Sequence, residues 1–292
     1  MSRAISKSQL NKIIKSITKY YPTGYADSAW DNTGLHIDCS VEDKDTKVTE
    51  PKVLLTIDLT TSVVQEAIDN NCNVILAYHP FIFPSWKSLT PGENPQHTSA
   101  IKLIQRGISV YCPHTSVDAA KGGVNDWLAN GLVNHSISMI KSAESIEKIG
   151  SNKLVNDDQT EEVGYGRLVK LNEPLTLSEI IHNVKQSLGV RHVQVATLEN
   201  DLSNCKISKI ALCAGSGSGV FRNLKEDVDL YYTGELSHHE ILKYKESGKA
   251  VIVCNHTNTE RGYLKKEMVQ LLQQEGIDTI VSTTDTDPLR VV

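Results

Sequence analysis

The chain has 292 residues, of which 39% are hydrophobic and 22% are charged. This length suits two domains, and this composition is typical of globular domains with buried cores, which excludes a disordered chain. The formal net charge of −5 argues against nucleic acid as the main partner, because phosphate binding favours a basic surface. No apolar run approaches the ~20 residues that a membrane helix needs, so we expect a soluble protein without a membrane partner.

The first 26 residues contain basic side chains and no acidic one. The larger apolar residues of this segment share one face of a predicted helix: Leu10, Ile13, Ile14 and Ile17. Such a segment is either the first helix of the fold or a mitochondrial presequence. We favour the first interpretation because Tyr20-Tyr21-Pro22 leads straight into a segment with the composition of a folded domain. The expected location is therefore cytoplasmic, with mitochondrial as the alternative.

Strands and helices then alternate along the first half of the chain. Continuous apolar runs predict strands, amphipathic runs between them predict helices, and strand–helix–strand units predict parallel strands with right-handed crossovers. The expected strands are 52–57, 74–77 and 108–112, and the expected helices are 61–71, 97–106 and the segment from Gly122-Gly123 to Leu132.

A polar, acidic segment at 151–162 has no periodicity and predicts a linker or exposed loop. Beyond it the alternation restarts, with strands at 163–171, 193–196, 207–214, 228–232, 250–254 and 277–282 and helices at 177–188, 237–246 and 259–274. The predicted class is α/β. We expect an N-terminal α/β domain at 1–145, a linker at 146–162 and a C-terminal α/β domain at 163–292. A variant of this division has the C-terminal segment packing back on the first domain.

The six cysteines form no Cys-x-x-Cys pair, and most lie in apolar runs. We interpret them as reduced core residues of a protein in a reducing compartment.

Side chains that can bind a metal follow the ends of several predicted strands, which is where ligands bind in parallel sheets. Three histidines and two carboxylates are placed in this way: His79, His114, Asp118, His256 and Glu260. Imidazole and carboxylate are the ligands that Zn, Mn and Fe accept. Each residue alone is more often a loop or cap side chain, so their common position carries the prediction.

Two further segments are candidates. The loop of Gly215, Ser216, Gly217, Ser218 and Gly219 follows a strand and is able to offer backbone N–H groups to an anion, although it is equally well explained as a flexible turn. The polar cluster Thr233-Gly234-Glu235 with His238-His239 provides Glu235 and His239 as candidate catalytic residues.

Several blocks of the sequence together resemble one family from about residue 8 to 285. They are Trp30-Asp31-Asn32-Thr33-Gly34-Leu35, Tyr78-His79-Pro80, His114-x-x-x-Asp118, Tyr232-Thr233-Gly234-Glu235 and Asn255-His256-Thr257-Asn258-Thr259-Glu260-Arg261. In this order they are similar to the signature blocks of the Nif-three-like family, also labelled GTP cyclohydrolase 1 type 2-like, and in particular to its fungal members.

The resemblance implies two interlocked α/β domains with a dinuclear metal site at their interface, assembled into a toroidal hexamer. It implies His79, Asp118, His256 and Glu260 as ligands of one or two Zn, Mn or Fe ions, with His114 as a polar neighbour. The family has two adjacent histidines where this chain has Tyr78-His79. An unperturbed tyrosine, with a pKa near 10, is a poor ligand, so we expect one metal position to be weakened or completed by water and His114.

Three functions are compatible with these features. The first is a metal-dependent hydrolase of a nucleotide-like or phosphate-containing small molecule, which agrees with the cyclohydrolase label. The second is a non-enzymatic oligomeric scaffold that interacts with a transcription coactivator, the interaction for which the yeast member is named. The third is a metal chaperone or store.

Overall fold

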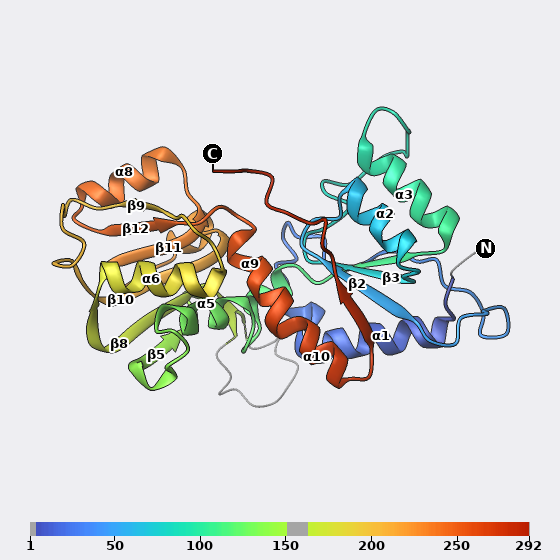
Figure 1. Cartoon of the computed structure of the whole chain (residues 1–292), viewed down its shortest axis with the longest axis horizontal. Coiled ribbons are helices and arrows are strands. Elements are labelled where there is room, and N and C mark those ends of the chain that lie inside the picture. The colour runs from blue at the N-terminus through green and yellow to red at the C-terminus, as the bar shows by residue number, and fades with distance from the viewer. Residues whose placement is uncertain (1–3, 151–162, 292) are drawn as a thin grey trace. The chain divides into compact units, whose positions relative to one another are not determined.

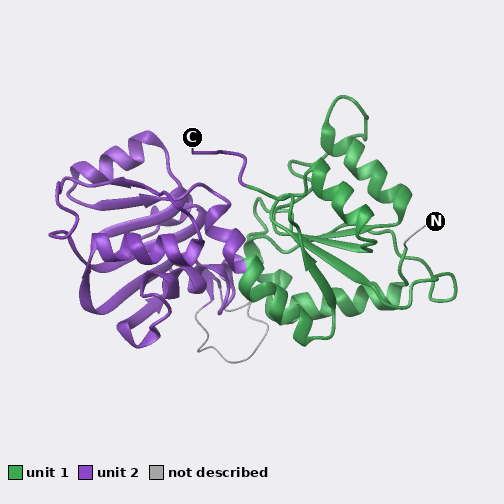
Figure 2. Ribbon diagram, viewed as in Figure 1, with its two compact units in different colours: residues 1–117, 264–286 green, residues 118–263, 287–292 purple. Residues whose placement is uncertain are grey.

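The computed structural model describes residues 4–150 and 163–291 of the chain. Among these residues are two sheets of five and six strands, each covered by helices, so the predicted α/β class is confirmed (Figure 1). The chain divides into unit 1, residues 1–117 and 264–286, and unit 2, residues 118–263 and 287–292 (Figure 2). No helix in the described ranges is long and apolar enough to cross a membrane.

The sheet of unit 1 has the strand order β1-β4-β3-β2-β13. Strands β13, β2, β3 and β4 are parallel, whereas the edge strand β1 is antiparallel to β4. The strands are β1 (Gly34–Ile37), β2 (Lys52–Thr56), β3 (Val74–Ala77), β4 (Ser109–Cys112) and β13 (Asp278–Val281). The helices are α1 (Lys7–Tyr20), η1 (Thr23–Tyr25), α2 (Thr61–Asp69), α3 (Pro95–Arg106), the π-helical η4 (Leu264–Met268) and α10 (Val269–Gln274).

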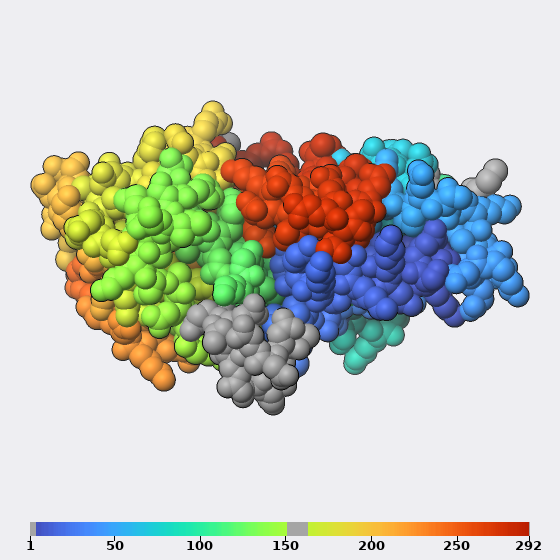
Figure 3. Space-filling view, turned by 90° about the horizontal axis from the view of Figure 1, so that it is seen from below, coloured from blue at the N-terminus to red at the C-terminus, as the bar shows by residue number. Residues whose placement is uncertain are grey.

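Helices cover both faces of this sheet. Helices α2 and α3 pack on one face, where Val64 and Leu103 join Leu54 and Ile75 of the strands in one apolar cluster. Helix α1 lies on the opposite side next to α10, as both Figure 1 and Figure 3 show, and the Lys19 and Tyr20 side chains both bond to Glu275.

Helix α1 is an integral element of unit 1. A capping box of Ser6 and Gln9 begins it, and its buried residues include Leu10, Ile13 and Ile17. The amphipathic face that the sequence presents is thus occupied by packing within the fold.

The sheet of unit 2 has the order β5-β8-β10-β11-β12-β9, with β10, β11 and β12 parallel and the other pairings antiparallel. Its apolar cluster includes Leu168, Ala211 and Phe221. The strands are β5 (Ile140–Glu144), β8 (Arg167–Thr176), β9 (Gln194–Ala196), β10 (Lys206–Ser216), β11 (Leu230–Glu235) and β12 (Ala250–Val253), with β6 (Glu147–Lys148) and β7 (Gly164–Tyr165) as a separate pair. The helices are α5 (Val124–Leu132), η2 (Ile137–Met139), α6 (Leu177–Leu188), α7 (Ser218–Phe221), α8 (His238–Glu246) and α9 (Asn258–Tyr263).

The structure places the division of the chain differently from the expected domain limits of 1–145 and 163–292. Unit 2 begins at Asp118, within the short helix α4 (Thr115–Ala119), because α5 bonds to β10 and α6, and β5 pairs with β8 in the second sheet. The expected linker 146–162 begins with a paired strand, β6, and its remaining residues 151–162 lie outside the described part of the chain. Residues 264–286 return to unit 1, where β13 pairs with β2.

Most predicted elements occur within a few residues of their expected limits. The helix expected at 259–274 is divided into α9, the π-helical η4 and α10. Strands β10 and β11 extend further than predicted, so Gly215 and Glu235 lie within strand ends and not in loops. No disulfide joins the six cysteines, all of which are in the described ranges.

Candidate metal centre

His79 stands just beyond the carboxyl end of β3 in unit 1. Its Nδ1 lies 2.9 Å from Oδ1 of Asp58, which follows the neighbouring parallel strand β2. Because a carboxylate only accepts hydrogen bonds, Asp58 favours the tautomer that carries the proton on Nδ1. The lone pair of Nε2 is then the one available to a metal.

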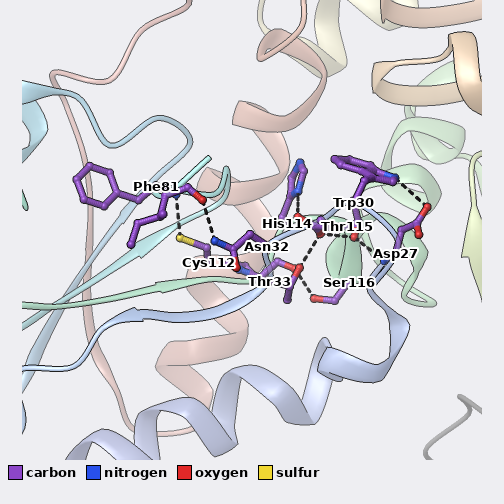
Figure 4. Close-up of polar contacts among 12 residues, drawn as sticks. Asp27, Trp30, Asn32, Thr33, Phe81, Cys112, His114, Thr115 and Ser116 are labelled. Atoms are coloured by element: carbon purple, nitrogen blue, oxygen red, sulfur yellow. Dashed lines mark hydrogen bonds and ion pairs between the residues drawn. The ribbon is translucent and has the colours of Figure 1, made fainter. Parts of the chain in front are cut away.

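His114 is held in the same manner, next to His79. Its Nδ1 lies 2.6 Å from Oδ1 of Asp31, whose other oxygen accepts bonds from the hydroxyls of Thr33 and Thr115. Figure 4 shows His114 within this network. Burial raises the pKa of Asp31, but the hydrogen bond and charge of His114 and the bonds from Thr115 and Thr33 outweigh this effect and lower the pKa to about 2. Asp31 is therefore an anion at neutral pH.

The backbone at His114 has an unusual conformation, as residues at functional sites often do. Its φ of +34° lies in the left-handed region that residues other than glycine rarely adopt. Strained backbone of this kind persists only where surrounding contacts impose it, and it is common at functional sites.

Tyr78 packs against both histidines, which also contact each other with ring centroids 5.5 Å apart. Its ring centroid is 5.5 Å from that of His79 and 6.2 Å from that of His114, both in edge-on geometry. Its side chain is almost fully buried. Tyr78 therefore contributes an aromatic ring that contacts both imidazoles.

Unit 2 carries a second group, at the end of β12. His256 follows Asn255, whose φ of +68° is also left-handed. The Nδ1 of His256 lies 3.0 Å from Oε1 of Glu235, at the end of the parallel neighbour β11, and its Nε2 lies 3.5 Å from Oε1 of Glu260. The Glu260 side chain, on α9, is only 3% exposed. An imidazole nitrogen and a buried carboxylate thus face one another.

Asp118 lies in the same unit, on the short helix α4. Burial raises the pKa of the Cys213 thiol, and the negative charges of Asp118 and Glu260 raise it further. A role of Asp118 as a metal ligand remains a prediction from sequence.

The end of β10 is shaped to admit the His256–Glu260 pair. A Cβ atom at Gly215 would lie 2.7 Å from Nε2 of His256 and 2.9 Å from Oε1 of Glu260, so only glycine fits there. The Gly215 N–H donates to Oγ1 of Thr259 at 2.8 Å. This amide is therefore already used within the protein and is not offered to an anion.

The rest of the Gly215–Gly219 segment is only partly loop. Ser216 belongs to β10, Ser218 and Gly219 belong to the one-turn helix α7, and the Ser218 hydroxyl donates to Oε2 of Glu240. Gly217 is packed against the Phe221 ring. Anion binding by this segment remains a prediction from sequence.

The two candidate catalytic residues occupy different environments. Glu235 contacts His256, and its side chain is 56% exposed. His239 lies on α8, exposed, with its ring 5.4 Å from that of His238.

Sequence reasoning did not identify Asp58 as a partner of His79. A signal was present, because Asp58 directly follows an apolar strand, as His79 does. The rule that polar residues gather at the carboxyl ends of parallel strands would have selected it.

The common feature of these side chains is a histidine whose Nδ1 is bonded to a carboxylate. It occurs three times, as His79 with Asp58, His114 with Asp31 and His256 with Glu235. Metal-binding histidines usually donate their second ring nitrogen in this way, which fixes the tautomer and raises the basicity of the ligating nitrogen. The residues present therefore fit a divalent metal.

Comparisons with known proteins identify one family. A family model described as Duf34/NIF3 (NGG1p interacting factor 3) matches residues 8–288. The chain is 59% identical over 295 residues to NGG1-interacting factor 3 of Saccharomyces cerevisiae, covering 100% of both sequences. It is 46% identical over 296 residues to the NIF3 homolog of Schizosaccharomyces pombe, covering 99% of both. The crystal structure of a Staphylococcus aureus hypothetical protein has a similar fold, with a TM-score of 0.75 and 27% identity over 99% of this chain and 100% of that one.

Proposed function

Because the chain belongs to the Duf34/NIF3 family, as the resemblance in its sequence blocks predicted, we propose that it binds one or two divalent metal ions and hydrolyses a nucleotide-like or phosphate-containing small molecule. The proposed ligands are His79, His256 and Glu260, with Asp118 added from the sequence analysis, so the set has two imidazoles and two carboxylates. Zn, Mn and Fe accept this set, and the absence of a thiolate ligand argues against a structural zinc site.

The observation that carries the proposal is the pairing of His79 and His256 with carboxylates through Nδ1. The two members of each pair follow or end adjacent parallel strands, so the fold holds the Nε2 atom of each histidine in a fixed orientation without a metal. This preorganisation lowers the free-energy cost of assembling a site.

A bound divalent cation would act as a Lewis acid that polarises a scissile bond and lowers the pKa of water. The protein contributes orientation and proton transfer. Asp58 and Glu235 hold the two imidazoles in the ligating tautomer. Because the Glu235 carboxylate is more than half exposed, it is also able to accept a proton from an attacking water molecule.

Metal content after purification tests the proposed ligands. We expect His256→Ala and Glu260→Ala each to lose most of the bound metal while remaining folded. His192→Ala and Glu246→Gln are matched controls, because both residues are exposed and belong to other parts of unit 2. Unchanged metal content in both ligand variants would refute the site.

A thermodynamic measurement gives an independent readout. A ligand at about 1,000 times its Kd stabilises the folded state by about 4 kcal/mol. Added metal should therefore raise the free energy of unfolding of the wild type and of the two controls, but not that of the ligand variants.

Turnover is tested separately with a panel of nucleotides at saturating metal. We expect metal-dependent product release by the wild type and its loss in Glu235→Gln. Tight, readily exchangeable metal without turnover of any compound would favour a metal chaperone or store.

The yeast relative, which is 59% identical, carries a name that describes interaction with NGG1. This favours a second candidate function, an oligomeric scaffold that binds a transcription coactivator. The family resemblance predicts a hexamer, and sedimentation that shows a stable 32.2 kDa monomer at micromolar concentration would refute it. Full partner binding by the metal-free His256→Ala variant would favour the scaffold over the hydrolase.

A further inference from the structure

A buried amide joins two segments of unit 2 that carry proposed ligands. Asn125, on α5, is fully buried. Its Nδ2 donates to the C=O of Asp118 at 2.9 Å, and its Oδ1 accepts from the N–H of Ala214 at 2.9 Å. Because one partner only accepts and the other only donates, the orientation of the amide is fixed.

A second buried side chain continues the connection from β10 to α9. Thr259 is also fully buried. Its Oγ1 accepts from the N–H of Gly215 at 2.8 Å and lies 2.6 Å from the C=O of His256, to which it donates. The path therefore runs from Asp118 through Asn125, Ala214-Gly215 and Thr259 to the peptide of His256.

We propose that Asn125 and Thr259 are positioning residues that set the separation between the Asp118 carboxylate and the His256–Glu260 pair. This inference rests on the proposed function, in which these three residues bind metal. Neither side chain contacts the metal on this account; each acts through the backbone of a ligand or of its neighbour.

The surroundings of Asn125 support a role beyond packing. Its neighbours along α5 include the buried apolar residues Val124, Leu128 and Ala129. An apolar residue of similar volume would fill such a position without requiring hydrogen-bond partners. A polar side chain satisfied at both ends instead specifies one register between the α4–α5 segment and β10, because a shift of either strand or helix would leave a buried group unpaired.

The same argument explains why the path ends on α9. The His256 and Glu260 side chains occupy the space where a Cβ of residue 215 would lie, and Gly215 has none. Any movement of β10 toward α9 would therefore reduce the space that both ligands occupy. Metal sites require their ligands within about 0.5 Å of the productive geometry, so fixing β10 also fixes the ligand pair.

Cobalt(II) titration of the full chain tests the proposal, since the visible absorption of bound cobalt reports coordination geometry as well as affinity. The test variants are Asn125→Leu and Thr259→Val, which keep volume and remove the hydrogen bonds. We expect each to lower cobalt affinity by about 10- to 100-fold, as loss of groups that orient ligands does, and to change the spectrum. Thr259→Ser keeps the hydroxyl and should therefore have the cobalt affinity and spectrum of the wild type.

Asn73→Leu is the matched control for loss of a buried asparagine. Asn73 lies in unit 1, is 4% exposed, and its Oδ1 accepts from the N–H of Lys52 at 2.9 Å. Urea unfolding in the presence of a chelator measures the stability of each metal-free variant. We expect Asn73→Leu to lose stability comparably while keeping wild-type cobalt affinity and spectrum.

Two outcomes would overturn the proposal. The first is that folded Asn125→Leu and Thr259→Val keep the wild-type cobalt affinity and spectrum while His256→Ala loses cobalt. This result would reject the positioning role and leave the proposed metal site in place. The other is an equal loss of affinity in Asn73→Leu, which shows that general destabilisation suffices. Retention of cobalt by His256→Ala and Glu260→Ala would instead reject the metal site itself.

Discussion

Substitution of Gly215 by alanine would place a methyl group against two proposed metal ligands. The added Cβ would lie 2.7 Å from Nε2 of His256 and 2.9 Å from Oε1 of Glu260. Ordinary contact with a Cβ begins at 3.4 Å, so the imidazole must retreat by about 0.7 Å. That displacement exceeds the tolerance of about 0.5 Å within which a metal ligand remains productive.

The backbone adds a second cost. Gly215 has a φ of +59°, where an L-residue is disfavoured by about 1–2 kcal/mol. We therefore expect Gly215→Ala to lower the free energy of unfolding of the metal-free protein by at least that amount. Metal affinity should fall by 10-fold or more, because the clash falls on the ligating nitrogen itself and not on a supporting group.

Isothermal titration with metal and urea unfolding with chelator measure the two effects separately. Gly219→Ala is the control in the same segment, because no atom lies within 4 Å of its added Cβ and its φ is not left-handed. A helical glycine replaced by alanine gains up to about 1 kcal/mol, so this variant should be as stable as the wild type or more so, with unchanged metal affinity. Wild-type metal affinity in folded Gly215→Ala would refute the assignment of Nε2 of His256 as a ligand atom.

Three further changes have expected outcomes. Glu235→Gln should weaken metal binding about 10- to 100-fold in a titration, because it removes the charge that fixes the His256 tautomer. Asp31, with its pKa lowered from 3.8 to about 2, should contribute about 2 kcal/mol to the free energy of unfolding, which is present above pH 4 and lost as the pH falls through 2. The difference in unfolding free energy between wild type and Asp31→Asn should shrink over that range, and a difference independent of pH would contradict this. Ile17→Ala in α1 should cost about 2–5 kcal/mol in urea unfolding, since this side chain is fully buried; a negligible cost would instead favour a dispensable presequence.

The fold was largely predictable from sequence because its strands are continuous apolar runs. Strand β3 occupies the predicted residues 74–77, and all four of its residues are buried, as expected for a parallel strand covered on both faces. The ends of such runs also predicted where His79 and His256 stand. These features are local, so a single sequence reveals them.

The division between units was not predictable in the same way. The polar composition of 151–162 indicated a boundary, whereas the structure divides the chain at Asp118. Residues 140–144 belong to unit 2 because β5 pairs with β8. The hydrophobic periodicity of the two segments does not reveal this contact. Composition locates exposed segments, but the assignment of a strand to a sheet depends on its partner.

The role of Gly215 shows the same limitation within the site. A glycine-rich loop after a strand suggests a flexible turn or an anion cradle. The structure shows that this glycine is required by His256, which is distant in sequence and adjacent in space. The Asp58–His79 pair is similar, because it arises only when β2 and β3 lie side by side.

Tyr78 stands where the resemblance implies a second histidine, and the metal stoichiometry of the protein is the final prediction. If Tyr78 vacates a ligand position, the wild type should hold fewer than two equivalents of metal at saturation, or hold the second weakly. Tyr78→His should then gain affinity for the second equivalent, because a new imidazole would stand beside His79. The alternative is that the Tyr78 hydroxyl is itself a working group, in which case Tyr78→Phe should impair turnover and leave metal content unchanged.

The packing around Tyr78 refines this test. Its ring rests against both His79 and His114, so Tyr78→Phe preserves the aromatic contacts, whereas the smaller imidazole of Tyr78→His leaves part of the space unfilled. Some loss of metal-free stability is therefore expected in Tyr78→His alone, and added metal should recover it if the new imidazole binds. Calorimetric titration and unfolding of the three proteins separate the cases. Two tight equivalents in the wild type, with no gain in Tyr78→His, would show that the tyrosine does not weaken a metal position, because the second metal would then be fully held by the remaining ligands.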